Sequence, residues 1–557
     1  MKNKLVIIIA SIVIAITCVI ELSVIIYSQM NSHVSNKEKY ASSKTAIESL
    51  SAEKLINGPS VPDKIGQKEI KPFTVIPESL KSFSYQISPA DKVIANHIQL
   101  DGITNYQNFK GISTFRGSNY RQNAFYGELE VNEKKLEKAW TNTVGNTDSW
   151  TGVGWNGQPA IVKWDNEVQK SMNLYDEFKN KEDFVEVICG SLDSHVHFYD
   201  METGKPSRDT IYVTSSIKGS VTVDPRGYPL LYVGQGINEV HGKEVRFGYH
   251  IFSLIDGKEL FFIDGRDKFA LVSWGAFDGN PVIDGASDTM ILPGENGLVY
   301  LVKLNTSWDK ENSQISVNPE VTRYRYSNAG RAGGMENAMT VYEHYAFFTN
   351  NYGTVQCLDL NTLTPIWSYQ MEDDCDSTIG LEEENGEIYL YVACEVDKRA
   401  RACPAYVKKL NGRTGEVIWE YSTVCQYDGN NNGGVLSSPI IGKGSISNMV
   451  IYNFAKVNTL GDGKFVVLDK NNGSVIWEKH LPNYSWSSPV AVYTKNNQAY
   501  LVFGDSAGVV HLIDPLTGEF LYSLPTGGGN MEGSPAVYDN HIIIGTRGQR
   551  IYRIDIK

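Results

Sequence analysis

Short apolar runs separated by polar turns recur along the chain from about residue 136 to its end. Many of these runs lead into a turn of the form Asp-x-x-Thr-Gly and then a strand with an aromatic residue, as in Leu468–Trp477 and Ile513–Tyr522. Asp or Asn opens such a turn through hydrogen bonds to nearby backbone, and Gly supplies the positive φ. Repetition of this unit predicts an all-β repeat architecture.

A second feature marks the start of each unit, where two small or polar residues, often followed by proline, precede an apolar strand. It occurs eight times, at Gly157, Gly219, Gly279, Asn337, Ser377, Ser437, Ser487 and Gly533. The spacing varies between 40 and 62 residues, which suits four short strands and loops of uneven length. This pattern predicts an eight-bladed β-propeller, and the short fourth unit leaves seven blades as the alternative.

The last unit is one strand short. Residues 533–557 supply three strands, Gly533–Tyr538, His541–Gly545 and Arg550–Ile556, and a strand with a Trp should follow them. Such a strand stands alone far upstream, at Leu136–Val144. We expect it to complete the last blade, because closure of the ring leaves no sheet edge open.

The N-terminal segment Leu5–Tyr27 is apolar, with Glu21 as its only charged residue. Its 23 residues can cross a bilayer as a helix, which needs about 20. Lys2 and Lys4 place the N-terminus in the cytoplasm by the positive-inside rule. Cleavage as a signal peptide is the rival interpretation, but no Ala-x-Ala-like site is evident.

These patterns divide the chain into four parts. We expect a transmembrane signal-anchor over residues 1–27, a polar stalk over 28–72, an irregular lead-in that packs on the propeller over 73–135, and the propeller over 136–557. Everything after the anchor should lie outside the cytoplasm, at a cell surface or in a periplasm. The net charge of −13 argues against a nucleic-acid partner, since phosphate binding needs clustered Lys and Arg.

Four of the seven cysteines, Cys375, Cys394, Cys403 and Cys425, lie close together in the sequence. Disulfides are permitted outside the cytoplasm, and Cys394–Cys403 with Cys375–Cys425 is one of three pairings. No Cys-x-x-Cys occurs, so neither a zinc ribbon nor a thioredoxin-like site is supported.

Candidate ligand-binding residues form a column directly before the small pair of each unit, where the innermost strands should meet the channel. The column contains Asn156, Lys218, Asp278, Glu336, Asp376, Leu436, Trp486 and Glu532. The turns between second and third strands should open on the same rim and add Asp193, Glu295, Asn351, Glu395, Asp505 and Arg547.

Carboxylates that converge at this rim would suit a cation, a polyamine or a basic peptide. Asp278, Glu336 and Asp376 are the candidate ligands for Ca²⁺, which prefers oxygen. Trp486 could stack a flat ligand or pack against the neighbouring blade. Solvent exposure of any channel rim explains polar residues there equally well.

The Asp-x-x-Thr-Gly-x-x-x-Trp turns and the Ser-Ser-Pro openings at Ser437 and Ser487 resemble the repeats of PQQ-like β-propellers. The lead-in Phe115-Arg-Gly-Ser-Asn-Tyr-Arg121 is similar to the Phe-Arg-Gly opening of such chains, and the resemblance covers roughly residues 110–557. This group includes quinoprotein alcohol dehydrogenases and the non-enzymatic outer-membrane protein assembly lipoproteins. The resemblance implies, for the dehydrogenases, a quinone held between a Trp and a disulfide of adjacent cysteines, beside Ca²⁺ and a catalytic Asp.

No two cysteines are adjacent in this chain, so the sequence assigns no catalytic residue and favours the non-enzymatic type. We therefore expect a membrane-anchored, extracytoplasmic binding or scaffold module for a protein, peptide or envelope polymer, without a cofactor. The alternative is an enzyme, either a quinoprotein dehydrogenase with PQQ and Ca²⁺ or another that uses rim carboxylates.

Overall fold

The computed structural model describes residues 72–90, 97–100, 102, 105–155, 157–429 and 431–557. The predicted span Leu5–Tyr27, all but the last residue of the predicted stalk, and the rim candidate Asn156 lie outside these residues. In the part of the chain that is described, no helix is long and apolar enough to cross a membrane. Residues 71–557 form one compact unit.

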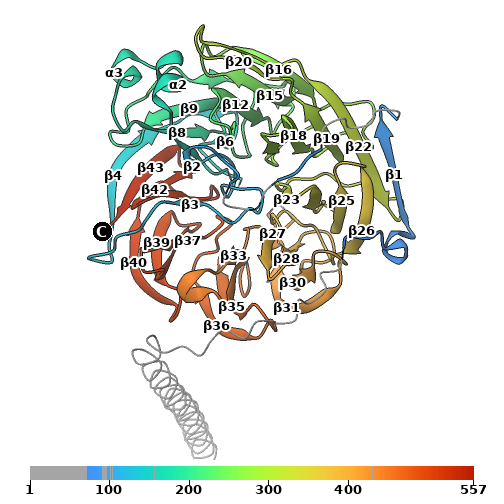
Figure 1. Ribbon diagram of the computed structural model, residues 1–557. Helices are drawn as coiled ribbons and strands as arrows, with labels where there is room; N and C mark the ends of the chain where they lie inside the picture. The colour runs from blue at the N-terminus through green and yellow to red at the C-terminus, as the bar shows by residue number, and fades with distance from the viewer. Residues whose placement is uncertain (1–71, 91–96, 101, 103–104, 156, 430) are drawn as a thin grey trace, which may run out of the picture. The chain divides into compact units, whose positions relative to one another are not determined.

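Eight antiparallel blades surround a central axis, as Figure 1 shows, so the prediction of an eight-bladed propeller is confirmed and the alternative of seven is wrong. From the axis outward, blades 1 to 4 consist of β7 (Ala160–Lys163), β8 (Val185–Gly190), β9 (His195–Asp200) and β10 (Ile211–Tyr212); β11 (Thr222–Val223), β12 (Leu230–Gly234), β15 (Gly248–Ser253) and β16 (Glu259–Asp264); β17 (Val282–Asp284), β18 (Thr289–Pro293), β19 (Leu298–Lys303) and β22 (Glu320–Asn328); and β23 (Thr340–Tyr342), β24 (Tyr345–Phe348), β25 (Thr354–Asp359) and β26 (Thr364–Gln370).

Blades 5 to 8 consist of β27 (Gly380–Glu384), β28 (Glu387–Ala393), β30 (Ala402–Asn411) and β31 (Val417–Gln426); β33 (Ile440–Ile441), β34 (Met449–Ala455), β35 (Gly463–Asp469) and β36 (Val475–Leu481); β37 (Val490–Tyr493), β38 (Ala499–Gly504), β39 (Val509–Asp514) and β40 (Glu519–Pro525); and β41 (Ala536–Tyr538), β42 (His541–Thr546), β43 (Arg550–Ile556) and β4 (Leu136–Thr143). Two short helices, α2 (Asn166–Ser171) and α3 (Asp176–Lys179), follow β7 in blade 1.

The ring closes as the sequence predicts. Strand β4 pairs antiparallel with β43, from Leu136 opposite Ile556 to Thr143 opposite Arg550. The last blade therefore combines a strand from the start of the propeller with three strands from its end. This pairing leaves the C-terminal blade without an open edge at β43.

Neighbouring blades are joined by a repeated contact between a tryptophan and a glycine. In each case, the Trp on the outermost strand of one blade packs on the Gly of the Asp-x-x-Thr-Gly-type turn in the next. The pairs are Trp140–Gly204, Trp367–Gly415, Trp419–Gly473 and Trp477–Gly518. Each indole nitrogen also donates to a carbonyl oxygen of that turn, at 2.8–3.0 Å. The pair Trp140–Gly204 joins blade 8 to blade 1, where the ring closes, because Trp140 belongs to β4.

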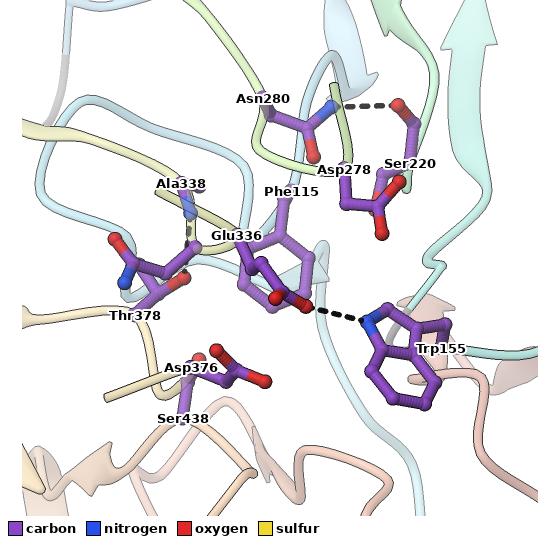
Figure 2. A pocket seen from close by; sticks show the side chains of 11 residues that line it. Phe115, Trp155, Ser220, Asp278, Asn280, Glu336, Ala338, Asp376, Thr378 and Ser438 are labelled. Atoms are coloured by element: carbon purple, nitrogen blue, oxygen red, sulfur yellow. Dashed lines mark hydrogen bonds between the residues drawn. The ribbon is translucent and has the colours of Figure 1, made fainter. Parts of the chain in front are cut away.

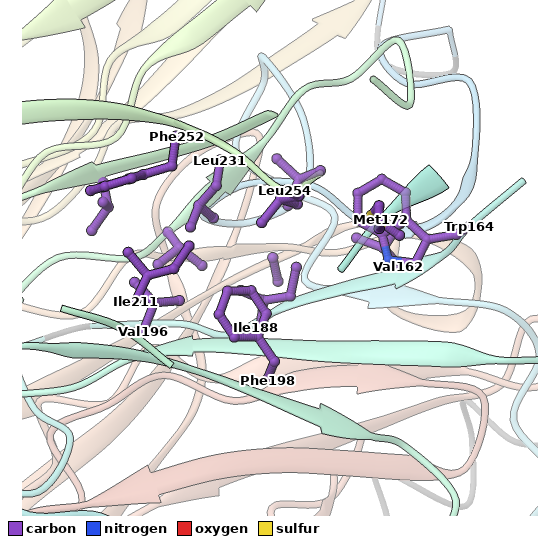
Figure 3. Close-up of a cluster of buried hydrophobic side chains, with 14 of the residues drawn as sticks. Val162, Trp164, Met172, Ile188, Val196, Phe198, Ile211, Leu231, Phe252 and Leu254 are labelled. Carbon is purple, nitrogen blue, oxygen red and sulfur yellow. The ribbon is translucent and has the colours of Figure 1, made fainter. Parts of the chain in front are cut away.

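Apolar side chains fill the space between the sheets. Between blades 1 and 2, Ile188 and Phe198 belong to the same buried cluster as Leu231 and Phe252, as Figure 3 shows. The alternation of side chains along each strand presents one apolar face to each neighbouring blade.

The lead-in extends three blades. β1 (Phe83–Ser88) adds a fifth strand outside β22, β2 (Lys110–Ile112) pairs with the inner edge of β7, and β3 (Phe125–Tyr126) runs parallel to β41. Between β2 and β3 the chain crosses the centre of the ring (Figure 1).

Two arginines anchor this central crossing. Arg116 donates to the carbonyl oxygens of Pro439 and Pro489, which begin the innermost strands of blades 6 and 7, at 2.9 and 3.1 Å. Arg121 donates to the carbonyl oxygens of Met339 and Pro281, in blades 4 and 3, at 2.7 and 3.0 Å. Burial lowers the pKa of both guanidinium groups to about 10, so they stay charged at neutral pH. The crossing thus ties four blades together through backbone carbonyls.

Candidate functional site

A small cavity lies in the channel, above the crossing segment. Figure 2 shows Asp278, Glu336 and Asp376 around a common space, with Trp155 at its side and Phe115 of the crossing segment behind. The space open to the centre of a water molecule is about 20 Å³. A water needs roughly 10–15 Å³ by this measure, so the cavity holds one water or one ion.

Three carboxylates converge here. One oxygen each from Asp278, Glu295 and Glu336 lies within 4.8 Å of the others. Asp278 and Glu336 come from the column predicted from the sequence, and Glu295 from the turn between β18 and β19. Asp376 lines the same cavity but is not one of the three.

The hydrogen bonds of the three carboxylates are incomplete. Glu336 accepts from Trp155 Nε1 at 3.3 Å and from Asn351 Nδ2 at 2.8 Å. Glu295 Oε2 accepts from Trp274 Nε1 at 2.9 Å, while its Oε1 has no partner among the described residues. Asp278, which is 6% exposed, has no hydrogen-bond partner for either oxygen in the same set.

Lys218 supplies a positive charge at the edge of this group. Its Nζ lies 3.7 Å from Asp278 Oδ2, beyond hydrogen-bond distance, and over the rings of Trp150 and Trp155 at 4.8 and 5.1 Å from their centroids. Burial works against its charge, but Asp278, Glu295 and their neighbours raise the pKa of Lys218 above its ordinary value.

Burial also shifts the carboxylates. It raises the pKa of Asp278 to about 6, with Lys218 opposing the shift and Glu336 adding to it. Burial, followed by neighbouring carboxylates, raises the pKa of Glu295, Asp376 and Glu395 well above the ordinary range. A cation that enters the cavity would favour the ionised form of these carboxylates and so stabilise them.

The other rim carboxylates have partners of their own. Asp193 lies 3.0 Å from His197 Nε2, Asp505 lies 3.2 Å from His511 Nε2, and Glu532 lies 2.9 Å from Arg547 Nη1. Glu395 Oε2 accepts from Asn432 Nδ2 at 2.7 Å. The rim is therefore not one continuous acidic funnel, because its unpartnered oxygens lie on blades 3 to 5.

Trp486 does not face the channel as an open stacking surface. It is 5% exposed and meets Trp155 edge-on, with ring centroids 6.0 Å apart, beside Leu436 and Tyr484. Trp486 therefore packs against neighbouring side chains, which is the second of the two roles considered for it.

These residues do not fit a pyrroloquinoline quinone. A cavity of about 20 Å³ has no room for a tricyclic cofactor, since pockets for organic ligands typically measure about 300–1,000 Å³. Trp486 is packed away, and the chain has no adjacent cysteines to cover such a ring.

Sequence reasoning missed Trp155, Trp274 and Phe115. Trp155 stands directly before the column position Asn156, and this placement is a signal that could have identified it, whereas Trp274 precedes Asp278 by four residues. Phe115 reaches the cavity only because the lead-in crosses the ring.

The four clustered cysteines meet in blade 5, and all six cysteines in the described part of the chain are free thiols. Cys403 and Cys425 lie directly opposite each other on β30 and β31. Glu395 N donates to Asp374 O at 2.8 Å, which brings Cys394 beside Cys375. The backbone thus favours Cys403–Cys425 with Cys375–Cys394 over the pairing that we singled out from the sequence.

We expect oxidised glutathione to link Cys403 to Cys425 in the folded protein. Opposed antiparallel residues have Cα atoms about 4.5–5.5 Å apart, within the range of a disulfide. The two thiols lose two protons and two electrons, which reduce one glutathione disulfide to two thiols. Burial raises the pKa of Cys425 to about 12, so the reaction should be slow. Peptide mapping by mass spectrometry without reduction would detect the link, and a Cys394–Cys403 bridge would contradict this expectation.

Comparison with known proteins supports the repeat assignment. The family model described as outer membrane protein assembly factor BamB matches residues 295–498 and 461–557. The outer membrane protein assembly factor BamB of Kangiella koreensis is 34% identical over 85 residues, which are 15% of this chain and 21% of that protein. The chain thus spans about a fifth of the curated relative that it matches.

Two solved structures are similar to this chain. Quinohemoprotein alcohol dehydrogenase from Comamonas testosteroni has a TM-score of 0.52 at 14% identity, over 81% of each chain. BamB from Moraxella catarrhalis has a TM-score of 0.47 at 15% identity, over 75% of this chain and 99% of that one. At these identities the likeness to the dehydrogenase concerns the fold alone. The eight-bladed ring and the matched repeats are similar to those of PQQ-like β-propeller repeat proteins, and the sequence matches are to the BamB type.

Proposed function

We propose that this protein is a non-catalytic binding module of the cell envelope, whose propeller docks another protein. The observation that supports the proposal is the channel, which the lead-in crosses and whose carboxylate-lined cavity offers about 20 Å³ to the centre of a water molecule. The repeat match to an outer membrane protein assembly factor supports a protein as the partner. The segment Leu5–Tyr27 would hold the module at the cytoplasmic membrane, with the propeller outside.

Exposed apolar side chains on loops next to the turns of blades 3 and 4 offer a place for such a partner. Leu271, Trp274 and Tyr352 are 53%, 37% and 44% exposed. Their loops meet on either side of Gly297 and Gly333, where glycines allow close approach. Exposed aromatic residues of this kind are typical anchors of protein interfaces.

Site-specific photo-crosslinking in the native envelope tests this proposal. A crosslinker at Leu271 or Tyr352 should capture one and the same protein, because their loops meet at Gly297 and Gly333. Matched positions at Val417 and Val475, which are 39% and 43% exposed on outer strands, should not capture it. Capture from the outer strands alone would move the interface to the lateral face. Alcohol oxidation by the purified protein with added quinone would instead support the enzyme.

A further inference from the structure

We propose that Asp278, Glu295 and Glu336 bind one Ca²⁺ ion in the channel, a site that goes beyond the docking function. The three oxygens lie within 4.8 Å of one another. Two of the three side chains are more than nine-tenths buried and have carboxylate oxygens without a partner among the described residues, Oε1 of Glu295 and both oxygens of Asp278. Figure 2 shows Asp278 and Glu336 facing the same small space.

Unpartnered buried carboxylates call for a physical explanation. Buried polar groups in proteins are nearly always hydrogen-bonded, and buried charges are paired or coordinate metals. Asp193, Asp505 and Glu532 follow this rule through His197, His511 and Arg547. Among the described residues Asp278 forms one ion pair, with Lys218 at 3.7 Å, and a cation between the three carboxylates would satisfy the remaining oxygens.

The charge of the group suits a divalent ion. Around a bound cation, which favours their ionised form, the three carboxylates and Lys218 sum to −2, and one divalent cation neutralises this charge. The two tryptophans keep the site in place, because Trp155 donates to Glu336 and Trp274 donates to Oε2 of Glu295. Among the described residues, Oε1 of Glu295 and both oxygens of Asp278 stay without a partner. An ion held here would join blade 3, which supplies Asp278 and Glu295, to Glu336 at the start of blade 4.

Buried carboxylates favour Ca²⁺ over Mg²⁺. Ca²⁺ binds oxygen at 2.3–2.6 Å in flexible geometry, whereas Mg²⁺ demands near-ideal octahedral geometry and gives up its water reluctantly. Three oxygens within 4.8 Å of one another can all reach one Ca²⁺. All three ligands are carboxylates, which also disfavours softer metals such as zinc.

Terbium luminescence provides a direct test on the full-length protein. Tb³⁺ occupies Ca²⁺ sites and emits when nearby indoles are excited, and Trp155 and Trp274 each touch a proposed ligand. We expect saturable emission on indole excitation, which Ca²⁺ displaces at lower concentration than Mg²⁺. Asp278→Asn and Glu295→Gln should each weaken Tb³⁺ binding at least tenfold. Asp505→Asn, at the same turn position as Glu295 but in blade 7 and paired with His511, should leave it unchanged.

A second measurement separates loss of the site from loss of the fold. Asp278→Asn removes an unpartnered buried charge, so without Ca²⁺ this variant should unfold at the same temperature as the wild type or higher. When Ca²⁺ is added, the unfolding temperature should rise for the wild type and not for the variant, because an ion that binds only the folded state raises the unfolding midpoint. No saturable emission from the wild type, or emission that survives in both ligand variants, would overturn the proposal.

Discussion

Replacement of Arg121 by alanine is expected to lower the free energy of unfolding by about 4 kcal/mol, a larger loss than most single substitutions cause. Arg121 is 1% exposed and donates to four carbonyl oxygens, those of Phe115, Asn280, Pro281 and Met339, and to the Thr114 hydroxyl. Each buried acceptor left unsatisfied costs about 1–3 kcal/mol, and water that enters the space offsets part of the sum.

Urea unfolding followed by tryptophan fluorescence would measure this loss. Arg121→Lys keeps the charge with fewer donors and should fall between wild type and Arg121→Ala. Arg401→Ala, at an exposed arginine, should change stability by less than about 0.5 kcal/mol. If Arg121→Ala unfolds like the wild type, the crossing segment does not hold the blades together.

Replacement of Trp367 by alanine should cost about 4 kcal/mol, within the range of 3–5 kcal/mol for buried aromatic truncations. The side chain of Trp367 is fully buried, lies on Gly415, and donates from Nε1 to Gly412 O at 3.0 Å. Its loss would leave a cavity between blades 4 and 5 and an unpaired carbonyl.

The same unfolding assay applies, with Tyr212→Ala as the control, because Tyr212 is 56% exposed. The loss should appear mainly as faster unfolding if the inter-blade contact forms late in folding. A change below about 1 kcal/mol would show that the blades adhere without the tryptophan contact.

The fold was predictable because its determinants are local and repeated. Each copy of the turn motif marks a hairpin between two strands of one blade. The missing fourth strand of the last unit indicated Leu136–Val144, which the structure places against β43. The aromatic residue of the fourth strand packs against the next blade, as Trp140, Trp367, Trp419 and Trp477 show.

The site was only partly predictable. Alignment of the repeats placed Asp278, Glu336 and Glu295 at one rim, but it also placed Asp193, Asp505 and Glu532 there. Which of these carboxylates lacks a partner depends on side chains elsewhere in the same blade, such as His197, His511 and Arg547. Repeat position alone carries no such information.

Contacts across the ring could not be predicted from the sequence either. The resemblance drew attention to Phe115–Arg121, yet no local pattern says that Arg116 and Arg121 reach four different blades. That arrangement follows from the path of the lead-in through the centre, which also places Phe115 at the cavity. Trp486 was ambiguous for the same reason, since its neighbour Trp155 comes from another blade.

The most direct test of a binding module without a quinone is thermal unfolding of the purified protein with pyrroloquinoline quinone and Ca²⁺, each added alone and together. Binding to the folded state raises the unfolding midpoint by mass action. This account predicts a rise with Ca²⁺ and no further rise with the quinone, together with no dye reduction by alcohols. A quinone-dependent rise accompanied by turnover would contradict it and would make the channel a catalytic site.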